Sequence, residues 1–162
     1  MAEEKRISPA VVIVGGLGLA LAGILGLTAL AWAVPPKAGT ILYAKWRETG
    51  TEEWHSLPLS VPEYTDVDIK WRVRNNSNDR ATFTIGAVSL GRYRLYPETL
   101  ITLDPGEEAD LIREGFAGEK AGTSGTMTFN LAALAGDVTS VYEPDWYDAD
   151  LVDAITIQYN WY

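Results

Sequence analysis

The sequence predicts a mainly β protein in which one N-terminal transmembrane helix precedes an antiparallel β-sandwich of about seven or eight strands. Two observations predict this architecture. Residues 10–34 are almost wholly apolar and carry no charge, whereas from residue 41 onwards apolar side chains recur at every second position. The first pattern is typical of a membrane-spanning helix, and the second of strands that bury one face. The predicted parts are a short cytoplasmic segment (1–8), the transmembrane helix (9–34), a linker (35–40) and an extracytoplasmic β domain (41–162).

The predicted helix is long enough to cross a membrane. At a rise of about 1.5 Å per residue, the 25 positions of 10–34 span roughly 37 Å, more than the roughly 30 Å hydrocarbon core. Ser8 can cap the helix, and Pro9 suits its first turn. Pro35 and Pro36 stop it, because proline lacks an N–H and clashes with a continuing helix.

A cleaved signal peptide is the alternative for this segment. Ala31-Trp32-Ala33 is a site of the A-x-A kind, and Lys5 and Arg6 form a basic start. The apolar stretch is longer than the 7–15 residues typical of a signal peptide. The length therefore favours a retained anchor.

Small residues recur along the predicted helix at a spacing of four. Rows of this kind let helix backbones approach closely in lipid, although glycine is also common in transmembrane helices in general. We expect these residues to pack against neighbouring helices, either in a homo-oligomer or with other membrane helices. The candidate packing residues are Gly16, Gly18, Ala20, Ala22 and Gly26.

Charge places the two predicted parts. Lys5 and Arg6 precede the helix and only Lys37 follows it, so the N-terminus is predicted to stay cytoplasmic and the β domain to be exported to a cell or virion surface. Residues 38–162 hold 20 acidic and 10 basic side chains, a formal charge of −10. A domain this acidic repels phosphate backbones, so nucleic acid is not a predicted partner.

The clearest strand runs from Val67 to Arg74, where apolar and charged side chains alternate. One face is therefore predicted to be buried and the other to be solvated. A turn follows at 75–79, rich in Asn and Ser. Other predicted strands are 41–47, 54–57, 100–103, 109–113, 127–134 and 155–161.

The strand after this turn shows the same alternation. Phe83 and Ile85 are predicted to be buried, and Thr82 and Thr84 to face solvent. The alternation shifts at Gly86, which predicts a β-bulge there.

Residues 67–111 resemble the immunoglobulin-like adhesion modules of bacteria and archaea. The shared pattern is an alternating strand, an Asn-rich turn, an aromatic strand and the proline–glycine turn Leu103-Asp104-Pro105-Gly106-Glu107. The resemblance implies that the sandwich is immunoglobulin-like.

The N-terminus, Lys5-Arg6-Ile7-Ser8-Pro9 before an apolar helix, resembles that of archaeal type IV pilins. In those proteins a basic residue precedes the processing site, and a β-branched residue, Ser and Pro follow it. This chain departs from the pattern, since Arg6 and not a small residue stands directly before Ile7. The resemblance implies a filament subunit whose helices bundle into a core beneath β-rich heads.

Motifs for catalysis and cofactors are absent from the sequence. There is no cysteine, which excludes disulfides, Cys-ligated zinc, Fe–S clusters and thiol nucleophiles. His55 is the only histidine, which excludes a multi-histidine metal site, and a structural role is expected for it. No phosphate-binding loop or nucleophile elbow occurs, and no cofactor is predicted.

An acidic and aromatic stretch near residue 146 offers two candidate sites. Asp145, Asp148 and Asp150 are candidate Ca²⁺ ligands, because Ca²⁺ prefers carboxylate oxygens, although a solvated acidic loop explains the same residues. Trp146 and Tyr147 are candidates for stacking on a sugar or contacting a protein, or else are core residues. Asn75-Asn76-Ser77 is a glycosylation sequon in a predicted turn, which makes Asn75 a candidate acceptor.

The leading hypothesis is a non-enzymatic, membrane-anchored structural or adhesive subunit of a surface filament, envelope or virion assembly. Its helix packs with neighbours in the bilayer and its β domain is exposed. The alternative is a monomeric, surface-displayed or secreted binding module for a glycan or protein ligand. An enzyme is a third option, since paired carboxylates can hydrolyse glycosides, but no pair stands out.

Overall fold

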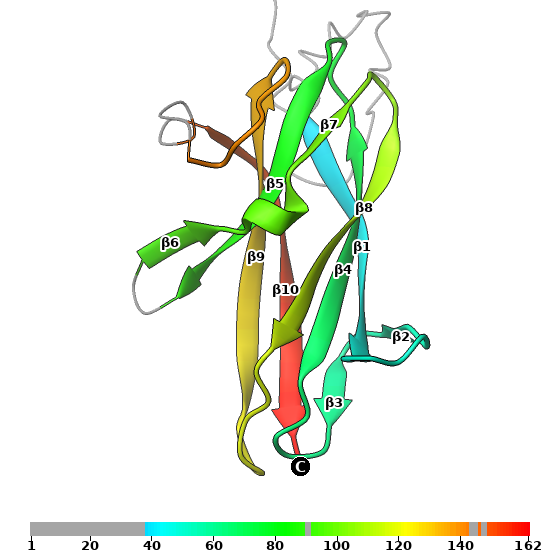
Figure 1. The fold of residues 1–162 in the computed structure, drawn as a ribbon, viewed down its shortest axis with the longest axis vertical. Coiled ribbons are helices and arrows are strands. Elements are labelled where there is room, and N and C mark those ends of the chain that lie inside the picture. Colours follow the sequence, from blue (N-terminus) through cyan, green and yellow to red (C-terminus); the bar gives the residue numbers. More distant parts are fainter. Residues whose placement is uncertain (1–37, 90–91, 143–145, 147–148) are drawn as a thin grey trace, which may run out of the picture. The chain divides into compact units, whose positions relative to one another are not determined.

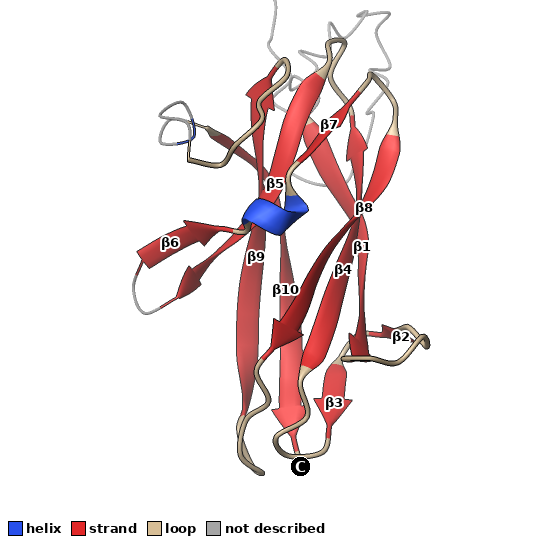
Figure 2. Ribbon diagram, viewed as in Figure 1, coloured by secondary structure: helices blue, strands red, loops and turns tan. Residues whose placement is uncertain are grey.

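The computed structural model describes residues 38–89, 92–142, 146 and 149–162, and these fold into a two-layer β-sandwich (Figures 1 and 2). They contain ten strands and one turn of 3₁₀ helix. In chain order these are β1 (Gly39–Glu48), β2 (His55–Ser56), β3 (Leu59–Val61), β4 (Val67–Asn75), β5 (Ala81–Ser89), β6 (Arg92–Leu95), η1 (Pro97–Thr99), β7 (Ile101–Leu103), β8 (Glu108–Phe116), β9 (Ser124–Ala135) and β10 (Asp150–Trp161).

The strands form two sheets. The four-stranded sheet has the order β2-β1-β4-β8, and the larger sheet has the order β3-β10-β9-β5-β6, with β7 also paired to β5. Among the described strands, every pair is antiparallel except β3 with β10, which is parallel. The predicted mainly β, antiparallel sandwich is therefore confirmed.

The core lies between the inner faces of the two sheets. Trp71 of β4 lies 4.9 Å from Phe129 of β9, measured between ring centroids, and both side chains are fully buried. Phe116 packs edge-on against Phe129 at 5.8 Å. Side chains alternate between the two faces of a strand, so every second residue of β4 faces the opposite sheet and is buried: Val67, Ile69, Trp71 and Val73.

An arginine covers the core between β8 and η1. The Arg113 guanidinium lies 4.2 Å from the centre of the Tyr96 ring and 4.9 Å from that of Phe116, and it pairs with Glu98. Cations bind the faces of aromatic rings in this way. The long Arg113 side chain thus closes the sandwich while its charge stays at the surface.

Several element boundaries differ from those predicted. The linker ends earlier, because β1 already begins at Gly39. The short strands β3 and β6 were not predicted, which raises the strand number from seven or eight to ten. Both are too short to show a clear alternation, and each pairs with only one neighbour in its sheet.

The predicted bulge at Gly86 is wrong. Pairing between β5 and β9 continues without a shift from Ala81 to Ala87. Beyond Ala87 the strand pairs with β6 alone, as a hairpin that leaves the sandwich (Figure 1). The alternation changes there because the core no longer dictates it, and Val88 is 63% exposed.

Three polar residues predicted to face solvent are buried. Thr82 and Thr84 are fully buried, and Asp68 is only 1% exposed. Hydrogen bonds make this burial possible, because a buried polar group without a partner is costly. The Thr84 hydroxyl, for example, lies 2.9 Å from that of Thr99 in η1.

The predicted transmembrane segment, 9–34, and its packing residues lie outside the described residues. Within the described part, the protein has no helix with the length and apolar character needed to cross a membrane. Residues Pro36–Tyr162 form one compact unit of their own.

Candidate interaction surfaces

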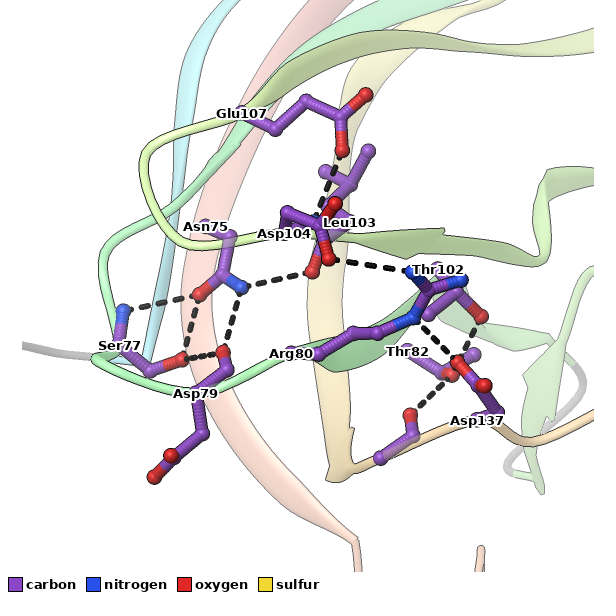
Figure 3. A network of polar contacts seen from close by, with 11 residues as sticks. Asn75, Ser77, Asp79, Arg80, Thr82, Thr102, Leu103, Asp104, Glu107 and Asp137 are labelled. Atoms are coloured by element: carbon purple, nitrogen blue, oxygen red, sulfur yellow. Dashed lines mark hydrogen bonds and ion pairs between the residues drawn. The ribbon is translucent and has the colours of Figure 1, made fainter.

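Asn75 organises the turn between β4 and β5 (Figure 3). Its side-chain amide donates to the carbonyl oxygens of Asp79 and Leu103, both at 2.9 Å. Its side-chain oxygen accepts a hydrogen bond from the Ser77 N–H at 2.9 Å. The residue is fully buried. A glycan on the amide nitrogen would displace these bonds, so the geometry argues against the predicted glycosylation of Asn75 and indicates instead that its amide builds the turn.

The same network joins two further turns (Figure 3). Arg80 Nε donates to Asp137 at 2.6 Å, and another of its nitrogens donates to Asp104 at 3.2 Å. The Thr82 hydroxyl donates to the Gly136 carbonyl at 2.7 Å and accepts from the Val138 N–H at 3.0 Å. These contacts fix the turns β4–β5, β7–β8 and β9–β10 against one another.

Trp146 lies in the β9–β10 connection and is only 7% exposed. Its indole N–H donates to the Ser140 carbonyl at 2.9 Å, so the side chain anchors the connection. The prediction of an exposed ligand contact at Trp146 is not supported, because a buried ring offers no face for stacking. Its predicted partner Tyr147 lies outside the described residues.

The candidate Ca²⁺ ligands are placed only in part. Asp145 and Asp148 lie outside the described residues, and Asp150 is an exposed residue at the start of β10. Within the described part of the chain, no group of three or more metal-binding side chains gathers.

Asp153 accepts a hydrogen bond from the Ile41 N–H at 2.8 Å. Both residues lie at register shifts, so this bond ties β1 to β10 where each is irregular.

The outer face of the four-stranded sheet carries a ladder of opposite charges. Arg72 on β4 contacts Glu108 at 3.2 Å and Asp110 at 3.3 Å on β8, and Lys70 lies 3.5 Å from Asp110. Hydrogen bonds from Arg74 and then Arg72 hold the pKa of Glu108 below its ordinary value. The charges largely neutralise one another across neighbouring strands.

Trp54 lies against this face between two cations. Its ring centre is 4.6 Å from the Arg47 guanidinium and 4.4 Å from the Lys70 ammonium. The connection between β1 and β2 is therefore held to the sheet by cation–π contacts. His55, expected to be structural, is half-buried and packs against Trp46, with the two ring centroids 4.7 Å apart and the rings tilted by 37°.

Asp68 occupies a register shift between β4 and β8. Its carboxylate accepts hydrogen bonds from Thr49 (2.7 Å), Arg47 (2.8 Å) and the Gly115 N–H (3.0 Å). Burial acts to raise the pKa of Asp68, but these bonds together outweigh it and lower the pKa. The carboxylate is therefore ionised and stabilises the irregular pairing.

A small cavity of about 30 Å³ lies within the sandwich. Its lining is apolar and includes Met127, Phe129 and Trp161. This volume is close to that of one water molecule, far below the roughly 300–1,000 Å³ of ligand pockets. At this size the cavity is too small for a ligand of ordinary size.

The outer face of the larger sheet has one uncharged region, which the sequence reasoning missed. In the region formed by Ser60 of β3, residues 124–130 of β9 and residues 154–160 of β10, the outward positions carry only Ser, Thr, Asn, Gln and Ala, and the exposed Asp150 and Leu151 lie beyond it at the start of β10. We call this region the uncharged face; its residues are Ser60, Ser124, Thr126, Thr128, Asn130, Ala154, Thr156, Gln158 and Asn160. All are exposed except Asn130, which is half-buried. The signal was present in the sequence, since neither 121–136 nor 154–162 contains a charge.

No protein-family model matches this sequence, and no curated protein matches it. Among solved structures, the chain is similar to a β-glucosidase from Listeria innocua, determined in complex with gluconolactone. The identity is 14%, with 74% of this chain and 16% of the enzyme chain covered and a TM-score of 0.28. The chain thus spans less than a fifth of that enzyme's length, and a likeness at this score carries no argument about fold or function.

Proposed function

We propose that this chain is a non-enzymatic, membrane-anchored structural or adhesive subunit of a surface filament, envelope or virion assembly. Residues 9–34 cross the bilayer once and pack with the same helix of neighbouring copies. The β domain lies on the outer side. The proposal rests on the uncharged and almost wholly apolar residues 10–34, with small residues spaced by four, joined to the β domain 41–162.

The β domain supports this proposal by forming a compact unit of its own, Pro36–Tyr162. Its core cluster runs from Ala44 to Trp161 and draws on both sheets. A domain with its own core suits an anchored head. The side chains of its β4–β5 turn and β9–β10 connection, Asn75 and Trp146, are engaged in internal contacts. For the binding-module alternative, Trp146 is therefore not an exposed contact, and the candidate Tyr147 lies outside the described residues.

We also propose that the sandwich is immunoglobulin-like, as the resemblance of 67–111 implies. In that fold the first, second and fifth strands share one sheet, and the third, sixth and seventh share the other. Here β1, β4 and β8 share one sheet and β5, β9 and β10 share the other. This grouping supports the proposal when the four short strands β2, β3, β6 and β7 are counted as additions to these six.

The assembly role is tested by substitution in the predicted helix. Gly18→Ile and Gly26→Ile place bulk on the row of small residues, and Leu21→Ile is the matched control on an already large position. The full chain is extracted from membranes in mild detergent, and particle size is measured by light scattering. We expect a large oligomer for the unaltered chain and the control, and a shift towards monomer for the glycine variants. A monomer in every case would overturn the proposal and favour the binding module.

A further inference from the structure

The uncharged face is unusual for a domain this acidic. Protein surfaces are ordinarily about 25–35% charged, so nine positions would carry roughly two or three charges. This face carries none, although residues 38–162 hold 30 charged side chains. It lies on β9 and β10, the two longest strands, which pair from Asp150–Ala133 to Asn160–Ser124 (Figure 1).

The side chains of the uncharged face form a regular array. Thr128 and Thr156 are directly opposite, with their hydroxyls 2.9 Å apart. Gln158 faces Thr126, and Asn160 faces Ser124 on one side and Ser60 on the other. Hydroxyl and amide groups both donate and accept hydrogen bonds, so such an array can pair with a copy of itself.

Charge indicates what covers this face. Two domains of formal charge −10 repel one another, and an interface core is depleted of charged residues. The charged ladder on the opposite sheet is largely neutralised within itself, so it offers no complementary surface. The uncharged face is where two copies can meet without burying carboxylates.

We infer that two copies of this chain contact each other through the uncharged face, each using the same surface. The inference rests on the proposed function, because the face is small. Four rows along the strands and two or three strands across cover roughly 20 by 12 Å, well below the roughly 800 Å² per partner of a standard interface. Anchoring in one membrane raises the effective concentration of the domains and makes a small contact sufficient.

Single cysteines test the contact, since the chain has none of its own. Thr156→Cys lies on the uncharged face, and Tyr43→Cys is its control, an exposed residue facing outward on the other sheet. Full-length protein in membranes is treated with a short bis-maleimide. We expect Thr156→Cys to cross-link into dimers at least about tenfold faster than the control. Equal rates, or faster linking through the control, would overturn the inference.

Paired charges separate a lost contact from a lost fold. In a Thr126→Cys background, Thr156→Lys or Thr156→Glu alone should reduce cross-linking at least about tenfold, and co-expression of the two should restore it. Normal cross-linking in both single variants would refute the contact. If the full-length particle persisted in that case, helix packing alone would hold the particle together. If the unaltered chain forms no particle, the proposed function is refuted instead.

Discussion

Replacing Asn75 by aspartate tests whether its amide builds the turn. The substitution preserves shape but puts an oxygen where the amide nitrogen donates to the Asp79 and Leu103 carbonyls, each 2.9 Å away. An ionised carboxylate cannot donate, and three oxygens then face one another in a buried place. The folded protein must therefore hold a proton on the introduced carboxyl group, whose pKa rises above the unfolded value of about 3.9.

The expected effect grows with pH. The folded state binds the proton more tightly than the unfolded state, so stability falls as pH rises between the two pKa values. The slope is about 1.4 kcal/mol per pH unit, and a shift of about three units gives a deficit of about 4 kcal/mol at pH 7. Near pH 4 only about 1 kcal/mol is lost, since a protonated acid donates one bond where the amide donated two.

Urea unfolding, followed by fluorescence of the six tryptophans, measures the deficit relative to the unaltered protein at each pH from 4 to 8. Asn78→Asp adds the same charge in the same turn at an exposed position and should change stability by less than about 0.5 kcal/mol at any pH. A deficit for Asn75→Asp that is equal at pH 4 and pH 8, or no larger than that of the control, would refute the reasoning.

Three further substitutions probe the fold. Asp68→Asn should cost about 1–3 kcal/mol at pH 7, because the ionic bonds at the register shift weaken. The pKa of Asp68 is lowered from 3.8, so the stability that its ionised carboxylate contributes is present above that pH and is lost as pH falls through the lower pKa of the folded state. The stability of the Asp68→Asn variant should therefore fall less steeply than that of the unaltered protein as pH is lowered. Gly39→Ala places a methyl 2.5 Å from the buried Phe83 ring and should lower the free energy of unfolding in urea by about 1–3 kcal/mol. An unchanged unfolding midpoint would show that the Phe83 ring moves to make room for the methyl. Trp146→Ala should cost about 3–5 kcal/mol and speed proteolysis of the β9–β10 connection; full stability would show that the ring anchors nothing.

Strong alternation made the main strands predictable. Apolar side chains recur at every second position over most of β4 and β10, in Val67–Arg74 and 155–161. A pattern of this length identifies a strand even where single residues nearby depart from it. Asp68 illustrates the limit of such a pattern. The alternation of β4 predicts that Asp68 faces solvent. The register shift between β4 and β8 instead places the Gly115 N–H against its carboxylate, and this partner is known only once the pairing of the two strands is known.

The sequence did not predict the burial of two candidate site residues. The Asn75 sequon and Trp146 both lie in segments whose composition resembles exposed loops. Asn75 is held by a partner distant in sequence, the Leu103 carbonyl 28 residues away, and Trp146 by the Ser140 carbonyl within its own connection. The uncharged face, by contrast, was visible in the sequence once the outward positions of β9 and β10 were known.

The most direct test of the central proposal is the intact mass and particle size of the native protein, extracted from membranes in mild detergent. We predict the mass of a chain that retains residues 9–34, in a particle containing many copies. A soluble monomer lacking about the first 33 residues would contradict the proposal, since cleavage after Ala33 would leave a secreted domain with neither anchor nor helix bundle.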